Sequence, residues 1–190
     1  MAKILAFAGS LREHSYNKRV LNIAVDGARS AGGEVTVLDL NELPMPIYNA
    51  DVHDREGCDP NAFRFQELLY AHDGFLIASP EYNGSLPGGL KNAIDWASRT
   101  SDKFKTNEVF AGKMAAMITA SPGAFGGLRC LQHLRGVLTI MGTWVIPKEI
   151  AVPLVSQKFD GDELEMTDEK TRGVLASVGA ELVDAINRRR

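Results

Sequence analysis

Short apolar segments alternate with longer amphipathic segments along most of the chain. Five of the apolar segments are rich in valine, isoleucine, leucine or alanine, which is typical of parallel strands that helices cover on both faces. We therefore predict strands over Lys3 to Ala8, Glu34 to Leu38, Gly74 to Ser79, Met114 to Thr119 and Thr143 to Ile146.

Apolar residues recur at helical spacing in the intervals between and after these strands. In the last interval, acidic residues precede the apolar stripe and arginines follow it, an order that suits a helix dipole. The predicted helices span about residues 17–29, 60–71, 87–99, 125–141 and 167–187. The acidic stretch after the second strand, residues 51–59, is either a solvated loop or a lid over a site.

Five strands, each followed by a helix, form the element order of a doubly wound α/β/α sandwich. We expect one domain over residues 1–190, with a five-stranded parallel sheet in the flavodoxin-like strand order 2-1-3-4-5. Chain direction reverses between strands one and three in that order. Ligands in such sheets sit beyond the carboxyl ends of the strands at this switch point. The segments that follow strands one, three and four are therefore the candidate site.

Composition excludes several classes of function. Lysine and arginine total 21 against 24 acidic residues, so the formal charge is −3 and there is no basic footprint for nucleic acid. Cys58, Cys130 and the histidines lack metal-ligand spacing, so we interpret the cysteines as buried, reduced thiols and expect no metal. The chain begins like a strand rather than a signal peptide, and no apolar run is long enough to cross a bilayer. We therefore expect a cytoplasmic protein that binds small molecules.

The segment after the first strand reads GSLREHSYN and leads directly into a predicted helix. Unpaired amides and the positive end of a helix attract an anion, and serine and asparagine side chains add hydrogen-bond donors. Arg12 offers a charge-assisted hydrogen bond. The segment is neither a Walker loop nor a dinucleotide fingerprint, and it has no cysteine nucleophile. We interpret it as a phosphate site, with an ordinary capped loop as the alternative.

Two further segments follow the third and fourth strands. The first, SPEYNGSLPG, is stiffened by two prolines and suits recognition of the edge of a flat heteroaromatic ring, with Tyr82 as a wall. The second, SPGAFGG, has glycines that let the backbone approach a ligand closely. The alternatives are a turn that only starts a helix and a loop that only allows helices to pack.

Taken together and in this order, GSLREHSYN, SPEYNGSLPGGLKNAIDW and ASPGAFGGLR resemble the NADPH-dependent FMN reductase family, which includes quinone, azo and chromate reductases. The likeness runs from about residue 3 to residue 147. It implies that Ser10, Arg12, Ser15 and Asn17 hold the FMN phosphate, with the amide of Tyr16 assisting. It also implies that Ser121 closes the site and that the isoalloxazine is lined by Pro80, Glu81, Tyr82, Asn83 and Gly84.

The resemblance implies that NADPH or NADH delivers hydride to flavin N5, so that no catalytic side chain is required. Two electrons then pass from the same face to a quinone or similar acceptor in a ping-pong cycle. A one-electron carrier like flavodoxin is an alternative, although the near balance of charges argues against an acidic docking face. A non-catalytic flavin-binding regulatory module is another.

A homodimer or homotetramer is expected through the helices near 87–99 and 125–141. In the first of these helices, Gly89 and Trp96 lie on a different side from the apolar stripe that would face the sheet. Exposed apolar area of this kind marks an interface. The alternative is that loops of the same chain cover Trp96.

Overall fold

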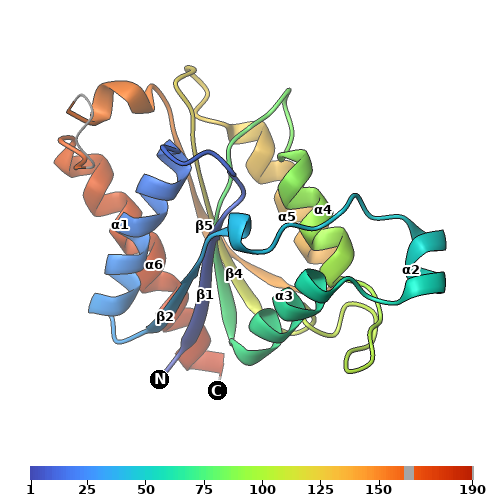
Figure 1. Ribbon diagram of the computed structural model, residues 1–190. Coiled ribbons are helices and arrows are strands. Elements are labelled where there is room, and N and C mark those ends of the chain that lie inside the picture. The colour runs from blue at the N-terminus through green and yellow to red at the C-terminus, as the bar shows by residue number, and fades with distance from the viewer. Residues whose placement is uncertain (161–164, 190) are drawn as a thin grey trace.

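The computed structural model describes residues 1–160 and 165–189, in which one parallel sheet stands between two layers of helices (Figure 1). The sheet has five strands in the order β2-β1-β3-β4-β5, so the predicted flavodoxin-like sandwich is confirmed. Its strands are β1 (Lys3–Ala8), β2 (Glu34–Leu38), β3 (Gly74–Ala78), β4 (Met114–Ala120) and β5 (Trp144–Val152).

Helices cover both faces of the sheet. In Figure 1, α1 and α6 lie on one face and α3, α4 and α5 on the other, while α2 projects beyond the second layer. Every helix of the described ranges is too short or too polar to span a membrane. The helices are α1 (Tyr16–Ser30), α2 (Ala50–Glu56), α3 (Pro60–Ala71), α4 (Gly88–Ala97), α5 (Leu128–Ile140) and α6 (Glu169–Arg189), with short 3-10 turns η1 (Leu40–Glu42) and η2 (Val155–Lys158).

Alternate residues of the central strands enter two separate hydrophobic clusters. In β1, Ile4 and Ala6 pack in the cluster beneath α1 and α6, whereas Leu5 and Phe7 pack in the cluster beneath the other layer. All four are fully buried. Two-sided burial explains why the central strands read as continuous apolar runs rather than as an alternating pattern.

Helices α1 and α6 approach one another unusually closely, and glycine makes this contact possible. A Cβ atom at Gly27 of α1 would collide with the carbonyl oxygen of Ala176 in α6. A Cβ at Gly179 of α6 would likewise collide with the carbonyl oxygen of Ala24. This pairing fixes the position of α1, and with it the amino-terminal end of α1 that borders the candidate site.

Strand β5 is longer than predicted and runs through Pro147. The polar residues that follow Pro147 end the apolar pattern, so the sequence indicated only its first part. A register shift interrupts its pairing with β4 between Ala115 and Met117. At the exposed edge of β5, Arg135 donates to the carbonyl oxygens of Val145 and Ile146. Proline, a bulge and a charged side chain protect such an edge from pairing with another strand.

The segment between β2 and α3 lies against α4. Trp96 Nε1 donates to the carbonyl oxygen of Pro46 at 2.8 Å, and the Tyr48 amide donates to Asn92 Oδ1 at 2.8 Å. The ring of Tyr48 packs edge-on to Trp96 with centroids 5.0 Å apart. Trp96 is therefore 1% exposed, and its predicted place at a subunit interface is wrong. The acidic stretch within this segment forms the short helix α2, which the periodicity did not indicate.

Several predicted boundaries shift for local reasons. Helix α5 begins at Leu128 rather than near Phe125, because Gly126 and Gly127 have φ values of 62° and 93°. Pro87 precedes α4 as its N-cap residue instead of lying inside the helix. Of the two cysteines, Cys130 is buried as expected, whereas Cys58 is only half-buried.

Candidate functional site

The loops after β1, β3 and β4 begin at one level of the sheet. Ala8 pairs with Ala78, and Ala78 pairs with Ile118, so the carboxyl ends of these three strands are aligned. A Cβ at Gly9 would come within 2.7 Å of Leu90 Cδ2 and 3.2 Å of Ser79 Oγ. The first loop, the end of β3 and helix α4 therefore converge at Gly9, and the three predicted segments meet at the switch point of the sheet.

The first loop ends in the N-cap of α1. Ser15 has extended backbone angles, and its Oγ accepts a hydrogen bond from the Asn17 amide at 3.2 Å. In the described part of the chain, the amides of Glu13, His14 and Tyr16 have no hydrogen-bond acceptor. Such amides, together with the helix dipole, form an anion-binding cradle.

The other two phosphate candidates of the first loop differ in exposure. Ser10 is 2% exposed, and its Oγ accepts from the Arg12 amide at 3.4 Å. The Arg12 side chain is exposed and makes no hydrogen bond or ion pair with any described residue. An arginine that is unpaired at an anion cradle remains available to a ligand.

Asn17 has a structural role that the sequence did not indicate. Its Nδ2 donates to the carbonyl oxygen of Ala120 at 2.9 Å, and its Oδ1 accepts from the Ala120 amide at 3.0 Å. The side chain is 3% exposed and joins the start of α1 to the end of β4. Its two hydrogen bonds to Ala120 leave only the second hydrogen of Nδ2 to donate to a phosphate. The phosphate contact of Asn17 therefore stays a prediction.

The loop after β3 contains a tight hairpin. Tyr82 and Ser85 exchange backbone hydrogen bonds of 2.9 and 3.1 Å around Asn83 and Gly84, whose φ values are 51° and 79°. Positive φ at both central positions defines a type I′ turn, for which Asn-Gly is the preferred pair. Pro80 precedes the hairpin and is buried, whereas Tyr82 is 47% exposed. The predicted stiffness of this loop has this hairpin as its physical basis.

The Glu81 carboxylate points to α5. Its Oε2 accepts from the amides of Arg129 and Cys130 at 3.0 and 3.3 Å, and its Oε1 accepts from Arg129 Nη1 at 2.9 Å. The carboxylate is thus occupied by protein donors. The backbone of Glu81 alone remains for the predicted contact with a flat ring.

The loop after β4 is fastened to the segment beyond β5. The Ser121 amide donates to the carbonyl oxygen of Val152, and the Val155 amide donates to that of Ser121. Ser121 Oγ accepts from the Gly123 amide at 3.1 Å. A Cβ at Gly126 would come within 2.7 Å of the Pro153 backbone nitrogen, so glycine permits this close contact. Ser121 lies at the carboxyl edge as predicted.

Cys130 lies close to these loops but is not a nucleophile. Its Sγ is 3.2 Å from Ser79 Oγ, and its side chain is fully buried. Burial raises the pKa of the Cys130 thiol to about 11. Since only a thiolate attacks or ligates efficiently, this residue is inert at neutral pH. In residues 1–160 and 165–189, no three His, Cys, Asp or Glu side chains are grouped as metal ligands would be.

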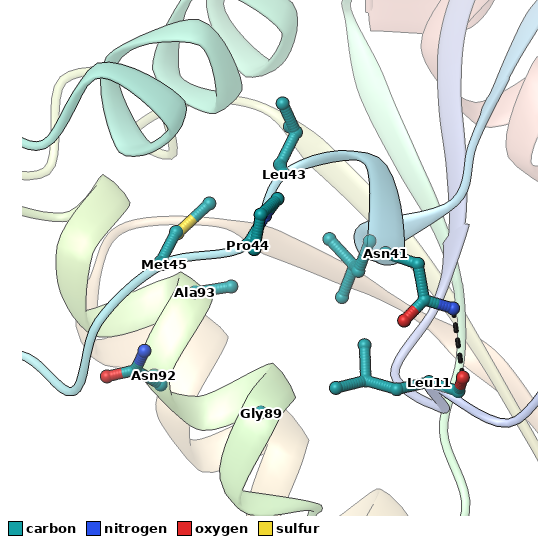
Figure 2. A pocket seen from close by; sticks show the side chains of 9 residues that line it. Leu11, Asn41, Leu43, Pro44, Met45, Gly89, Asn92 and Ala93 are labelled. Atoms are coloured by element: carbon teal, nitrogen blue, oxygen red, sulfur yellow. Dashed lines mark hydrogen bonds between the residues drawn. The ribbon is translucent and has the colours of Figure 1, made fainter.

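A cavity of about 210 Å³ lies beside the loop after β1, between that loop, η1 and α4 (Figure 2). Leu11 forms one wall, and its carbonyl oxygen accepts from Asn41 Nδ2 at 2.9 Å. Leu43, Met45 and Ala93 give the cavity an apolar lining. A cavity for an organic cofactor has roughly 300–1,000 Å³, so this small space borders the candidate site and does not replace it.

Sequence reasoning missed the residues that hold the second loop from α5. Arg129 pairs with Glu81, and His133 Nδ1 is 3.0 Å from Ser85 Oγ. Arg129 is the last residue of the segment ASPGAFGGLR, in which the resemblance implied a role only for Ser121, and His133 lies outside the three motifs. The helical spacing of these two positions was a further signal, because it places them on one side of the helix.

Comparison with known proteins identifies the family. The profile of the NADPH-dependent FMN reductase family matches residues 2–157. An NAD(P)H-dependent FMN reductase of Pseudomonas aeruginosa is 38% identical over 174 residues, which cover 91% of this chain and 89% of the relative. A quinone reductase of Escherichia coli is 36% identical over 174 residues, covering 89% of this chain and 87% of the relative. An NAD(P)H:quinone oxidoreductase of Solanum tuberosum is 39% identical over 181 residues, which cover 93% of this chain and 88% of the relative.

Solved structures agree with this assignment. The flavoenzyme FerB of Paracoccus denitrificans, an NAD(P)H:(acceptor) oxidoreductase, superposes with a TM-score of 0.79 at 28% identity, covering 99% of this chain and 98% of FerB. An azoreductase of Bacillus anthracis superposes with a TM-score of 0.64 at 17% identity, covering 99% of this chain and 100% of the azoreductase. This likeness shows that the two proteins share a fold. The aligned carboxyl-edge loops, the matching profile and these relatives establish that the chain belongs to the NADPH-dependent FMN reductase family.

Proposed function

We propose that the chain is an FMN-dependent NAD(P)H oxidoreductase that passes two electrons by a ping-pong cycle to a quinone or similar small acceptor. The observation that carries the proposal is the alignment of three loops at the switch point of the sheet. Each of these loops offers a different part of a flavin site. The family and its relatives supply the class of reaction.

The loop after β1 fits the FMN phosphate. Unpaired amides lie at the start of α1, and the Ser15 hydroxyl and the Arg12 guanidinium add donors beside them. A phosphate needs several donors because its oxygens lose water on binding, and charge-assisted hydrogen bonds are the strongest replacement. Ser10 and Tyr16 complete the proposed phosphate site. Asn17 holds the start of α1 in place through its hydrogen bonds to the Ala120 backbone.

The loop after β3 fits the isoalloxazine ring. The type I′ hairpin holds the backbone from Pro80 to Ser85 in one conformation, so its amides and carbonyls are preorganised for a ring edge. Asn83 and Gly84 form the turn, and Ser121 borders the ring site from the loop after β4. Bound FMN supplies hydride and two-electron chemistry, and the chain supplies binding, orientation and electrostatics.

Exposed apolar side chains around these loops suit a flat apolar acceptor. Tyr82 is 47% exposed and Phe125 is 66% exposed, while Leu11 of the phosphate loop is 51% exposed. Aromatic side chains favour stacked or edge-on contact with a planar ring. A quinone meets these requirements. One open face then serves the nicotinamide donor and the acceptor in turn.

Two further parts of the proposal concern assembly and location. We propose a homodimer or homotetramer whose contact uses α5, because Leu128 is 43% and Ile140 is 85% exposed. Exposed apolar side chains along a helix favour an interface. The large apolar residues of α4 are buried within the chain, so α4 contributes little apolar area. Cytoplasmic location stays a prediction.

Stopped-flow spectroscopy tests the proposed function. The purified protein is loaded with FMN, mixed with NADH or NADPH, and then reoxidised by quinones, azo dyes or free flavin in separate experiments. We expect rapid bleaching by a nicotinamide followed by reoxidation by a quinone. Slow reduction of the flavin by both nicotinamides, together with rapid electron exchange with a protein partner, would favour a one-electron carrier. A colourless protein that takes up no flavin would favour a regulatory module and reject the proposal.

A further inference from the structure

Helix α5 lacks a capping side chain of its own. Its N-cap residue is Gly127, with a φ of 93°. A Cβ at this position would overlap the Thr119 hydroxyl, so no serine, threonine or aspartate can occupy it without displacing the end of β4. The first amides of a helix need acceptors, and leaving them unpaired is costly. The amides of Leu128 and Cys130 donate to the carbonyl oxygens of Phe125 and Gly127, so the Arg129 amide is the first-turn amide whose acceptor a distant part of the chain supplies.

Glu81 supplies this cap from the loop after β3. Its Oε2 accepts from the amides of Arg129 and Cys130, which belong to the first turn of α5. The Glu81 side chain is only 13% exposed, whereas the Arg129 side chain with which it also pairs is 57% exposed. Exposed ion pairs contribute little, while a carboxylate on helix amides gains from the dipole as well as the hydrogen bonds. The cap is the stronger of the two connections.

The hairpin beyond Glu81 has one more hydrogen-bond contact with the same helix. His133 Nδ1 lies 3.0 Å from Ser85 Oγ, one turn further along α5. Glu81 and Ser85 flank the type I′ turn, so α5 contacts the hairpin on both sides. This arrangement connects the loop after β3 directly to the loop and helix after β4.

We propose that Glu81 is a positioning residue that acts through α5: by capping this helix, its carboxylate holds the Tyr82 to Ser85 hairpin in the orientation that receives the flavin ring. His133 is the second anchor of the same hairpin. The inference rests on the proposed function, because the ring site is formed by that hairpin. It assigns to Glu81 a role different from direct contact between its side chain and the ring.

Two substitutions at Glu81 distinguish the contribution of the helix cap from that of the ion pair with Arg129. Glu81→Ala removes both. Glu81→Gln retains an acceptor oxygen for the two amides but loses the ion pair with Arg129. The amides of Tyr82 and Ser85 bond to each other's carbonyl oxygens, so their hydrogen exchange reports opening of the hairpin. This exchange is measured on apoprotein, and FMN affinity is measured separately by quenching of flavin fluorescence.

We expect Glu81→Ala to speed exchange at Tyr82 and Ser85 by about tenfold and to weaken FMN binding by about tenfold, the equivalent of a lost helix cap. Glu81→Gln should change either quantity by about threefold or less, because it keeps an acceptor oxygen and loses only the ion pair and the interaction of the charge with the helix dipole. Unchanged exchange and affinity in Glu81→Ala would overturn the proposal. Equal losses in Glu81→Gln and Glu81→Ala would also overturn it, because charge rather than the cap would then be responsible.

Leu138→Ala is the matched control for general instability, since Leu138 is fully buried at the other end of α5. We expect it to lower the melting temperature without faster exchange in the hairpin. If it reproduces the exchange and affinity losses of Glu81→Ala, the positioning role is rejected. His133→Ala alters an exposed residue and does not threaten folding. It should speed exchange at Ser85, and no change would reject the two-anchor arrangement.

These measurements distinguish the inference from the proposed function. If the wild-type protein fails to bind FMN, the proposed function fails. The exchange comparison on apoprotein still decides whether Glu81 holds the hairpin. If the wild type binds FMN and Glu81→Ala binds it equally well, the proposed function stands and the positioning role is rejected.

Discussion

The side chain of Asn17 pairs with the backbone of Ala120, 103 residues further along the chain, through a donor and an acceptor at once. One amide group thereby joins the helix that follows β1 to the end of β4. The loop before Asn17 carries the proposed phosphate site, and the loop after Ala120 carries Ser121, which borders the proposed ring site. Their relative position depends on a buried hydrogen-bond pair rather than on apolar packing alone.

We expect Asn17→Ala to lower the free energy of unfolding by about 2–3 kcal/mol, because the Ala120 amide and carbonyl would lose their partners in a buried place. FMN affinity should fall as the start of α1 separates from β4. Urea unfolding and fluorescence titration measure the two effects. Asn187→Ala, at an exposed position of α6, is the control and should stay within about 0.5 kcal/mol. Equal stability of the two variants would contradict the role assigned to Asn17.

Arg12→Ala should weaken FMN binding by roughly 1.5–3 kcal/mol, the range for a hydrogen bond to a charged group. Stability of the apoprotein should change little, because the Arg12 side chain is exposed and pairs with no described residue. Equilibrium dialysis against FMN gives the affinity. Arg64→Ala removes the same charge from an exposed position of α3 and should leave the affinity unchanged. Retention of full affinity by Arg12→Ala would show that Arg12 is not a phosphate ligand.

Steady-state turnover should give parallel lines in double-reciprocal plots, because one open face must serve the donor and the acceptor in turn. The measurement varies NADPH at several fixed quinone concentrations. High quinone concentrations should inhibit competitively against the nicotinamide, since both occupy the same face. Intersecting lines, which indicate a ternary complex, would exclude a single shared site while leaving the flavin assignment intact.

Leu128→Glu should shift the protein toward monomer in sedimentation equilibrium, because a charge would be buried in the proposed α5 contact. The wild type should sediment at no less than twice the 20.7 kDa chain mass. Val174→Glu, at an exposed apolar position of α6, is the control and should leave the mass unchanged. A monomeric wild type at micromolar concentration would remove the proposed interface. Trp96 does not belong in this test, since its substitution would disrupt packing within the chain.

Alkaline pH should destabilise the fold through Cys130. Its pKa is about 11 in the folded chain against an ordinary value of 9.0, so the folded state retains a proton that the unfolded state releases between these values. The contribution of this thiol to the free energy of unfolding is therefore fully present below about pH 9 and is lost as pH rises toward about 11. Urea unfolding across this interval should show a shallower fall for Cys130→Ala than for the wild type. Identical slopes would show that the thiol does not contribute.

In the described part of the chain, the sequence by itself determined the five strands, five of the six helices and their order, and it indicated which loops to inspect for a site. The strands β1 and β2 have the predicted bounds, and α3 begins and ends where predicted. These features follow from local periodicity, proline and glycine, which act over a few residues. The order of strands and helices then limits the topology to a few arrangements. The three candidate-site loops, after β1, β3 and β4, could be identified because each directly follows a recognisable strand.

Only the tertiary structure decided which partner each side chain of the site uses. Glu81 bonds to Arg129, 48 residues away, and Trp96 bonds to the backbone of Pro46, 50 residues away. Helical spacing shows that Trp96 lies off the sheet-facing stripe, but it cannot show that a segment from another part of the chain covers it. The carboxylate of Glu81 likewise bonds to amides that only the folded chain brings near. Such contacts depend on how distant segments come together, and local sequence carries no direct record of that.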